Sequence, residues 1–437
     1  MPTPLPTQIT GAQFLASRRA ALLADAPRVG KTGASIRAAD YVMARTILVI
    51  TTATGRAQWG YELGQWGLPR SIHVHYGAKT PLPEADAVVV GWHEFFQEPL
   101  FSALTARRWD VLIPDEAHYA CNVMNGSAPT RRTIGLYGKG GLASVSGYVW
   151  PLTGTPMPNG APDDLYPMLR GLAPSRLTPY AAHDDFINRF CVVKTKRYQG
   201  RLENVVVGGQ NLDDLNQRLD GFFLRRTQQD VGILPPRYDM FALDVDKLPA
   251  ELANCPEAEA ILDAARSDDT RSLEMHMGPL RRITGTIKAH AVIEAAREQL
   301  KDRRIRKLVL MAWHTDVIDA LWKGFAEFGV CGIDGRTDPL LRRPMAAKFQ
   351  EDALYRVFVG QIQAAGEAID LSEADELWFV EYSFLPKDMA QASLRITNHS
   401  RKAQGLVRVC ALPGSFDEVL VSILLPKVAT IRKVMEH

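Results

Sequence analysis

The chain has 437 residues, of which 46% are hydrophobic and 23% are charged. This composition is typical of a globular protein with two or three domains, so it excludes a disordered or fibrous chain. The longest apolar runs fall far short of the roughly 18 residues needed to cross a bilayer, and the N-terminus lacks the pattern of a secretory signal. Lys+Arg (51) nearly balances Asp+Glu (49), which excludes a uniformly basic surface but not a locally basic face.

The cysteines are few and widely separated. They are Cys121, Cys191, Cys255, Cys331 and Cys410, and no two of them form a CxxC pair. This spacing predicts a reduced, cytosolic protein without a structural zinc site. The sequence also contains no motif of a nuclease or of an acyl-transfer enzyme.

Short apolar runs alternate with helix-favouring segments along the whole chain. In the N-terminal half, the predicted strands are 46–51, 72–76, 87–91, 110–115 and 148–152. In the C-terminal half, the predicted strands are 307–313, 330–334, 355–360, 376–381 and 406–412. Continuous apolar runs bounded by polar turns indicate parallel strands that are covered by helices on both faces.

A polar, helix-favouring stretch separates the two series of strands. We therefore predict an α/β protein with two tandem lobes, each a parallel sheet flanked by helices. The predicted divisions are 1–212 for the first lobe, 213–287 for a helical connector and 288–437 for the second lobe. Ligands of open parallel sheets bind beyond the carboxyl ends of the strands, so motifs in those loops are the candidates for function.

The first such motif is Gly30-Lys31-Thr32, at the start of a predicted helix. A phosphate-binding loop needs a glycine for close backbone approach, a lysine for the β- and γ-phosphates and a hydroxyl for magnesium. The full GxxxxGK[ST] pattern is not met, because Asp25 occupies the first glycine position. Taken alone, the motif fits a plain helix start equally well.

The second motif, Asp115-Glu116, ends the predicted strand 110–115. Asp115 can hold magnesium through its coordination shell, and Glu116 can polarise an attacking water. Adjacent acids also occur in ordinary surface turns. A GKT motif followed some 80 residues later by a strand that ends in Asp-Glu is a much rarer combination, and it predicts a site of nucleoside triphosphate hydrolysis.

Two later segments add hydroxyl and arginine side chains. Thr153, Gly154 and Thr155 follow a predicted strand, where small hydroxyl residues can report the state of the γ-phosphate to another lobe. Gln391 and Arg395 are four residues apart and would share one face of a helix. An arginine supplied across a lobe interface can stabilise phosphoryl transfer, although a solvated surface arginine is the ordinary alternative.

These motifs, in this order, resemble helicase superfamily 2, and most closely its Swi/Snf-type DNA translocases. PTQITGAQFLA (6–16) is similar to the family's glutamine motif and GKT (30–32) to its motif I. DEAH (115–118) is similar to motif II and LTGTPMPN (152–159) to motif III. The more discriminating match is FFLRRTQQDVGILPPR (222–237), because few other helicase groups carry this connector. The residue pattern of 364–395 is most similar to the fork-remodelling, strand-annealing branch of these translocases.

The resemblance implies two RecA-like lobes that bind ATP and Mg²⁺ and move along DNA. The implied nucleotide-binding residues are Gln8, Arg28, Gly30, Lys31, Thr32, Gly366 and Asp370. The implied catalytic residues are Asp115, Glu116, Gln391, Arg395 and Arg401, with Thr32 and Asp115 as the magnesium ligands. The implied coupling residues are His118, Thr153, Gly154 and Thr155. The implied DNA contacts are Thr51, Thr52, Arg225, Arg226 and His314.

The sequence departs from the family pattern at three places. Arg28 stands where motif I usually has a glycine, and Ala368 replaces a common glycine of motif V. In motif VI, Asn398 occupies the usual place of the second arginine, and the next arginine is Arg401, as though three residues were inserted. We therefore expect ATP turnover and leave its rate open.

Several basic clusters are candidates for a nucleic-acid face, although runs of charge are usually solvated. They lie at 107–109, 131–133, 194–201, 222–227 and 301–307. Because phosphate contacts would dominate, we expect sequence-independent and salt-sensitive binding to duplex or forked DNA. We also expect a monomer that works on DNA in the cytoplasm of a prokaryotic or phage-infected cell, with replication or repair proteins as possible partners.

Two other functions remain open from the sequence. One is a strand-separating helicase of the same fold that acts on DNA or RNA. The other is a nucleotide-dependent scaffold of a replication or repair assembly with little ATPase activity, which Arg28 and the stretched motif VI would favour.

Overall fold

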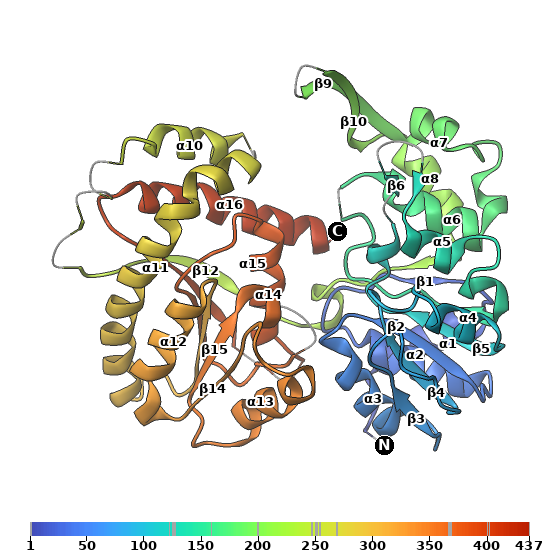
Figure 1. The fold of residues 1–437 in the computed structure, drawn as a ribbon, viewed down its shortest axis with the longest axis horizontal. Helices are drawn as coiled ribbons and strands as arrows, with labels where there is room; N and C mark the ends of the chain where they lie inside the picture. Colours follow the sequence, from blue (N-terminus) through green and yellow to red (C-terminus); the bar gives the residue numbers. More distant parts are fainter. Residues whose placement is uncertain are drawn as a thin grey trace. The chain divides into compact units, whose positions relative to one another are not determined.

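The computed structural model divides the chain into two compact units, Met1–Thr227 and Gln228–His437 (Figure 1). It describes residues 2–121, 123–124, 128–158, 160–198, 201–245, 248–249, 252, 255–267, 270–365, 369–399, 401 and 403–436. Within these ranges, no helix has the length and apolar character needed to span a membrane. The division into two units falls inside the segment predicted as a connector (213–287), and the three predicted domain bounds remain predictions.

The first unit is built on a parallel five-stranded sheet in the order β3-β4-β2-β5-β8. Its strands are β2 (Ile47–Thr51), β3 (Ile72–Val74), β4 (Ala87–Gly91), β5 (Trp109–Pro114) and β8 (Ser146–Val149). All five were predicted, because parallel strands are apolar on both faces. Along β2, Leu48 and Ile50 join one hydrophobic cluster, whereas Ile47 and Val49 join another on the opposite face.

Helices cover both faces of this sheet. They are α1 (Pro6–Ala16), α2 (Lys31–Tyr41), α3 (Gly55–Trp66), α4 (Leu100–Thr105), α5 (Arg131–Tyr137), α6 (Tyr166–Leu172), α7 (His183–Phe190) and α8 (Leu212–Leu219). Short 3₁₀ turns are η1 (Ala117–Ala120), η2 (Leu142–Val145), η3 (Pro162–Leu165) and η4 (Pro174–Leu177). The helices shield the strands from water, so each strand can remain fully apolar.

Three strand pairs of the first unit were not predicted. They are β1 (Leu22–Leu23) with β11 (Phe223–Leu224), β6 (Val123–Met124) with β7 (Ala128–Pro129), and β9 (Cys191–Tyr198) with β10 (Arg201–Gly209). The β1–β11 pair is parallel and joins residues about 200 positions apart. Such short or polar strands lack the continuous apolar run that marks the strands of the central sheet. The β9–β10 hairpin is antiparallel and extends from the unit (Figure 1).

The second unit contains a parallel six-stranded sheet in the order β12-β17-β16-β13-β15-β14. Its strands are β12 (Arg237–Ala242), β13 (Leu308–Ala312), β14 (Val330–Ile333), β15 (Val357–Gln361), β16 (Glu376–Phe379) and β17 (Leu406–Ala411). Five of them were predicted. Strand β12 was missed because it lies at the edge of the sheet, is partly exposed and therefore lacks a continuous apolar run.

Helices also cover both faces of the second sheet, which confirms the predicted fold class. They are α10 (Ala258–Arg266), α11 (Thr270–Lys301), α12 (Thr315–Gly324), α13 (Pro339–Glu351), α14 (Ile362–Ala365), α15 (Pro386–Ser393) and α16 (Phe416–Glu436). The 3₁₀ turns are η5 (Gln229–Val231), η6 (Ala326–Phe328) and η7 (Leu394–Ile396). The predicted boundary at residue 288 falls inside α11, which continues from the connector segment into the second lobe.

A buried ion pair joins α11 to α16. Lys288 Nζ lies 2.7 Å from Asp417 Oδ1, and both side chains are at most 2% exposed. Tyr382 Oη donates to the same oxygen at 2.7 Å, and the amide of Leu412 donates to Asp417 Oδ2 at 2.9 Å. Asp417 therefore ties the long helix to the residues that follow β16 and β17.

We predict that Asp417→Ala lowers the free energy of unfolding of the second unit by about 3–5 kcal/mol, because Lys288 would keep a buried charge without its partner. Urea denaturation measures the loss. The matched control is Asp263→Ala, which removes the partner of Arg266 from an exposed pair and should change stability by less than about 1 kcal/mol. Equal losses in the two variants would contradict this role of the buried pair.

Candidate nucleotide-binding site

The GKT segment forms a tight loop that ends at the first turn of α2. Gly30 caps the helix with φ of +105°, a backbone conformation that side chains with a Cβ rarely adopt. Arg28 lies two residues earlier with φ of +72°, so the arginine occupies a left-handed conformation that favours glycine. The loop therefore keeps the shape that the usual glycine would give it, at the cost of some backbone strain.

Lys31 is the first residue of α2, and its side chain turns back over the loop. Its Nζ donates to the carbonyl oxygens of Asp25 at 2.7 Å and of Ala26 at 3.3 Å. Burial lowers the pKa of Lys31, while the negative charges of Glu116, Asp25 and Asp115 oppose that shift. The ammonium group thus lies near three carboxylates. A bound phosphate chain would add negative charge there, and a metal ion would add positive charge.

Asp25 is fully buried, and its carboxylate pairs with Arg226 from the far end of the first unit. Arg226 Nε donates to Asp25 Oδ1 at 3.0 Å, and Nη2 donates to Oδ2. Arg226 Nη1 also donates to the Thr7 carbonyl oxygen at 2.6 Å and to Thr10 Oγ1 at 2.7 Å. One guanidinium group therefore joins the loop, α1 and the connector.

Gln8 of α1 lies against the glycines of the loop. A Cβ added to Gly33 would come within 2.5 Å of Gln8 Nε2, and one added to Gly30 within 2.8 Å of Gln8 Cγ. Gln8 Oε1 accepts a hydrogen bond from the Leu5 amide at 2.8 Å. The predicted glutamine motif thus packs directly on motif I, and the glycines make this close approach possible.

Asp115 follows β5 at the carboxyl end of the sheet, as predicted. Its Oδ2 accepts hydrogen bonds from Thr51 Oγ1 at 2.9 Å and from the indole N–H of Trp59 at 2.7 Å. The backbone carbonyl oxygen of Asp115 accepts a third bond from the indole of Trp92 at 2.7 Å. Burial and the nearby charge of Glu116 raise the pKa of Asp115 to about 6, and the two side-chain hydrogen bonds oppose this shift.

The residues predicted to hold magnesium have the oxygens that the ion requires. Asp115 Oδ1 and Thr32 Oγ1 have no hydrogen-bond partner among the described residues. Magnesium in nucleotide sites usually binds one or two protein oxygens together with waters and phosphate oxygens. Within the part of the chain that the structure describes, no group of three or more His, Cys, Asp or Glu side chains offers a complete protein cage. The residues fit a magnesium ion that arrives with a nucleotide.

Glu116, His118 and the threonines after β8 form a connected group. Glu116 has φ of +53°, and its Oε2 lies 3.3 Å from His118 Nδ1. The same nitrogen lies 3.0 Å from Thr153 Oγ1 and 3.3 Å from Thr155 Oγ1. A Cβ on Gly154 would come within 3.0 Å of Pro27 in the phosphate loop. The structure therefore brings motifs I, II and III together.

Three of the predicted DNA contacts in the first unit have other partners. Thr51 is fully buried and donates to Asp115, so its side chain exposes no surface to a DNA strand. Thr52 Oγ1 accepts from the Gly55 amide at 3.2 Å, at the start of α3. Arg226 is engaged by Asp25. These side chains contact other parts of the protein, and their predicted contacts with DNA remain predictions.

Arg225 connects the same elements. Its Nη1 donates to the carbonyl oxygens of Ala24 at 3.2 Å and Gly154 at 3.4 Å. Burial lowers the pKa of Arg225, and its positive charge is one of the influences that lower the pKa of Lys31. Its predicted contact with DNA remains a prediction.

In the second unit, the two predicted arginines have different surroundings. Gln391 lies in α15 and Arg395 in η7, the turn that continues this helix. Arg401 donates to the carbonyl oxygens of Ala403 and Asp375, each at 3.0 Å. Further acceptors of its guanidinium are the carbonyl oxygens of Ser372, Ala374 and Ile396. Backbone carbonyls thus engage the guanidinium of Arg401, and its role as a second arginine finger remains a prediction.

Two further predicted residues of the second unit are Gly366 and Asp370. Gly366, together with the substituted Ala368, lies outside the described residues. Asp370 is exposed, and its Oδ1 accepts a hydrogen bond from the Ser372 amide at 3.0 Å. Its predicted contact with nucleotide remains a prediction.

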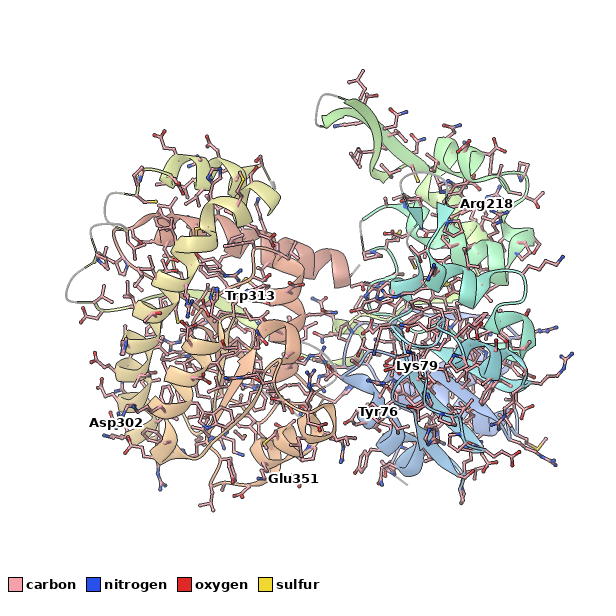
Figure 2. The ribbon with its side chains drawn as sticks, in the orientation of Figure 1. Tyr76, Lys79, Arg218, Asp302, Trp313 and Glu351 are labelled. Carbon is pink, nitrogen blue, oxygen red and sulfur yellow. The ribbon has the colours of Figure 1, made fainter. Side chains whose placement is uncertain are left out.

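The predicted DNA contact His314 is held by an acid that the sequence analysis missed. Glu381 is 3% exposed, and its Oε1 lies 2.6 Å from His314 Nδ1. Its Oε2 accepts from the amides of Trp313 at 2.8 Å and His314 at 2.9 Å. The guanidinium of Arg281 lies 4.0 Å from the centroid of the Trp313 ring, which Figure 2 labels. The signal was present, because Glu381 ends the apolar run 376–381 as Asp115 ends 110–115.

We predict that Arg226→Ala lowers the stability of the first unit by about 3–5 kcal/mol, since Asp25 would remain buried without its partner. Urea denaturation measures the change. The control is Arg189→Ala, because Asp214 would keep Arg218 as a partner and the loss of stability should be much smaller than in Arg226→Ala. A stable Arg226→Ala protein with weakened DNA binding would instead favour the predicted DNA contact.

Comparisons with known proteins agree with this arrangement of motifs. A family model described as the SNF2-related domain matches residues 7–280. The chain is 25% identical over 440 residues to the DNA annealing helicase and endonuclease ZRANB3 of Mus musculus, covering 96% of this chain and 40% of the relative. It is also 25% identical over 429 residues to the SWI/SNF-related matrix-associated actin-dependent regulator of chromatin subfamily A-like protein 1 homolog of Caenorhabditis elegans, covering 94% of this chain and 59% of that protein.

A similar solved structure is the Sulfolobus solfataricus SWI2/SNF2 ATPase core in complex with dsDNA. Its sequence is 19% identical to this chain, and the TM-score is 0.45. The match covers 100% of this chain and 93% of that structure. The chain thus spans about two fifths of the mouse relative and three fifths of the nematode relative. Both of these relatives are animal proteins, and they do not support the predicted prokaryotic or phage source.

Proposed function

This chain belongs to the SNF2-related domain family, and from that premise we propose that it is an ATP-dependent motor that moves along duplex DNA and remodels forks or recombination intermediates. The observation that carries the ATPase part is the meeting of Lys31, Asp115 and Glu116 with the Thr153 segment at the carboxyl edge of the first sheet. The DNA part is supported by the relatives, one of which is named a DNA annealing helicase.

Each motif has a distinct role in this proposal. Lys31 and the amides at the start of α2 bind the phosphates, and Thr32 and Asp115 hold magnesium. Bound magnesium neutralises charge that develops on the phosphate oxygens. Glu116 orients and polarises the attacking water, while Gln8 contacts the base.

The network of hydrogen bonds would hold these groups in place and report their state. Thr51 and Trp59 bind Oδ2 of Asp115, which leaves Oδ1 without a hydrogen-bond partner among the described residues and able to hold a metal ion. His118 connects Glu116 to Thr153 and Thr155, which gives a direct path from the hydrolytic water to the segment after β8. We assign Arg395 as the arginine that stabilises phosphoryl transfer, and the protein would act as a monomer in association with DNA.

One experiment separates this function from its rivals. ATPase activity is measured with duplex DNA, forked DNA, single-stranded DNA and RNA. Stimulation by duplex or forked DNA is the expected result for a translocase, whereas stimulation by single strands or RNA would favour a strand-separating helicase. ATP binding without stimulated hydrolysis would favour the nucleotide-dependent scaffold.

We predict that Glu116→Gln leaves ATP binding intact and lowers DNA-stimulated hydrolysis at least 10²-fold, because the amide cannot polarise water as a carboxylate does. Single-turnover hydrolysis and nucleotide titration measure the two steps. Glu84→Gln, the same substitution at an exposed position of this unit, should leave both unchanged. Unchanged turnover in the Glu116 variant would reject the assignment.

The two arginines of the second unit should respond differently to substitution. We expect Arg395→Ala to reduce ATP turnover about 10³-fold or more with little change in stability, because the effect acts on phosphoryl transfer. Arg401→Ala should mainly lower stability, since several buried carbonyls would lose their donor. Turnover and urea denaturation are measured for both. The reverse pattern would identify Arg401 as the finger.

A further inference from the structure

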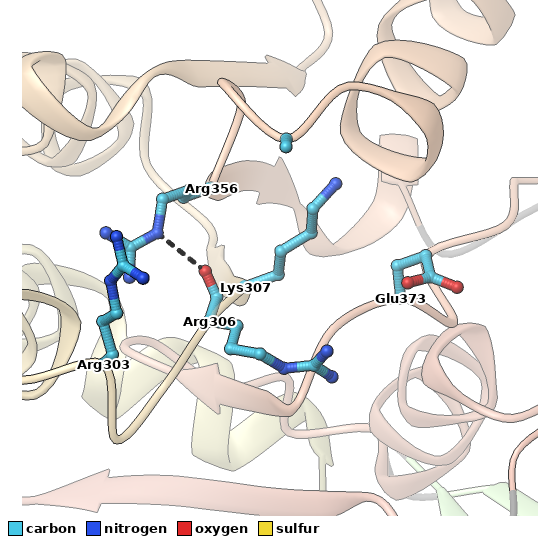
Figure 3. A pocket seen from close by; sticks show the side chains of 6 residues that line it. Arg303, Arg306, Lys307, Arg356 and Glu373 are labelled. Carbon is cyan, nitrogen blue, oxygen red and sulfur yellow. Dashed lines mark hydrogen bonds between the residues drawn. The ribbon is translucent and has the colours of Figure 1, made fainter.

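The second unit has a hollow of about 440 Å³ on the edge of its sheet where the strands begin (Figure 3). Its lining consists of Arg303, Arg306, Lys307, Ala353, Arg356 and Glu373. Lys307 directly precedes β13 and Arg356 directly precedes β15. Because His314 and Glu381 follow the ends of β13 and β16, this hollow lies at the opposite edge of the sheet from the predicted site residues.

Backbone carbonyl oxygens of the unit hold two of the four cationic side chains, Arg356 and Lys307, in place. Arg356 Nε donates to the Arg306 carbonyl oxygen at 2.9 Å (Figure 3), and its Nη2 donates to the Leu300 carbonyl oxygen at 2.8 Å. Lys307 Nζ donates to the carbonyl oxygens of Asp352 at 3.1 Å and of Phe349. These bonds use part of the donor capacity and position the charges before any ligand arrives.

The carboxylates nearby do not balance this charge. Glu373 is the one acid in the lining, and Arg306 Nη2 pairs with Asp375 Oδ1 at 2.8 Å outside it. Arg303 is exposed, and its guanidinium has no hydrogen bond or ion pair within the described residues. Arg356 Nη1 likewise has no partner there. The hollow therefore offers unused guanidinium N–H donors next to fixed positive charges.

From this lining we infer that the hollow is a binding site for phosphate groups. Guanidinium forks match phosphate oxygens in pairs and bind them with charge-assisted hydrogen bonds. The volume lies within the range of about 300–1,000 Å³ that ligand pockets have. The lining contains no aromatic ring on which a base could stack, so it recognises phosphate rather than a nucleobase. The phosphate can belong to a free polyphosphate chain or to a nucleic-acid backbone.

Pyrophosphate titration by calorimetry tests this site. The parent protein is the full chain with Lys31→Ala, which removes the side chain expected to bind phosphate in the first unit. It is compared with two double variants, in which Arg303→Gln or Arg304→Gln is added to Lys31→Ala. Arg304 is the matched control, because it has the same charge but pairs with Glu298 and Asp302 outside the hollow. We expect Arg303→Gln to weaken pyrophosphate binding about tenfold and Arg304→Gln to change it less than twofold.

A second measurement identifies the source of the phosphate. The affinity for duplex DNA is measured as a function of salt with the Lys31 residue intact. If the hollow binds the DNA backbone, Arg303→Gln reduces the slope of log affinity against log salt by about 1, whereas Arg304→Gln does not. An unchanged slope together with weakened pyrophosphate binding assigns the site to free phosphate compounds.

Two results would overturn the inference. One is that the parent chain with Lys31→Ala does not bind pyrophosphate. The other is that Arg303→Gln and Arg304→Gln bind it equally well. Neither result depends on ATP hydrolysis, so a failure of the proposed motor activity would leave the pyrophosphate comparison valid.

Discussion

The buried ion pair between Asp25 and Arg226 is the constraint on which the rest of the first unit depends. Asp25 stands at the position where a phosphate-binding loop usually has its first glycine, and it is fully buried. A buried carboxylate is stable only when it is paired and hydrogen-bonded, and Arg226 supplies both conditions. An aspartate can therefore replace the usual glycine of the loop because Arg226 neutralises it, and Asp25 in turn holds Arg226 inside the protein. The same guanidinium also reaches α1, so Gln8 is held against the glycines of the loop.

The motif residues that follow the strands are grouped at the carboxyl edge of the first sheet. Parallel strands end at one edge, so Asp115 after β5 and Thr153 beyond β8 come within reach of the loop that precedes α2. Buried hydroxyl and indole groups then orient the acid, and His118 links the acid to the threonines. In the second unit, Glu381 is also an acid that follows a strand, and its two oxygens bind backbone amides and His314.

The sequence predicted the central strands and the grouping of motifs well, because both depend on local patterns. Ten apolar runs marked ten strands, since strands buried on both faces must be continuously apolar. The pattern did not predict the edge strand β12, the short β1–β11 pair or the β9–β10 hairpin, because their residues are partly polar or too few. Side-chain partners were harder to predict. Thr51, Arg226 and Arg401 were assigned to ligands by their motifs, whereas the structure gives them partners within the protein.

The sequence by itself determined the class of fold, the order of the motifs and the near balance of charge. Tertiary structure alone decided which charges are used internally and which remain available. Arg226 and Arg303 are both members of basic clusters, yet one is paired with a buried acid and the other has no partner among the described residues. The physical reason is that pairing and desolvation depend on contacts between segments up to about 200 residues apart, which no local pattern records. A net charge of +2 therefore coexists with a concentrated basic hollow in the second unit.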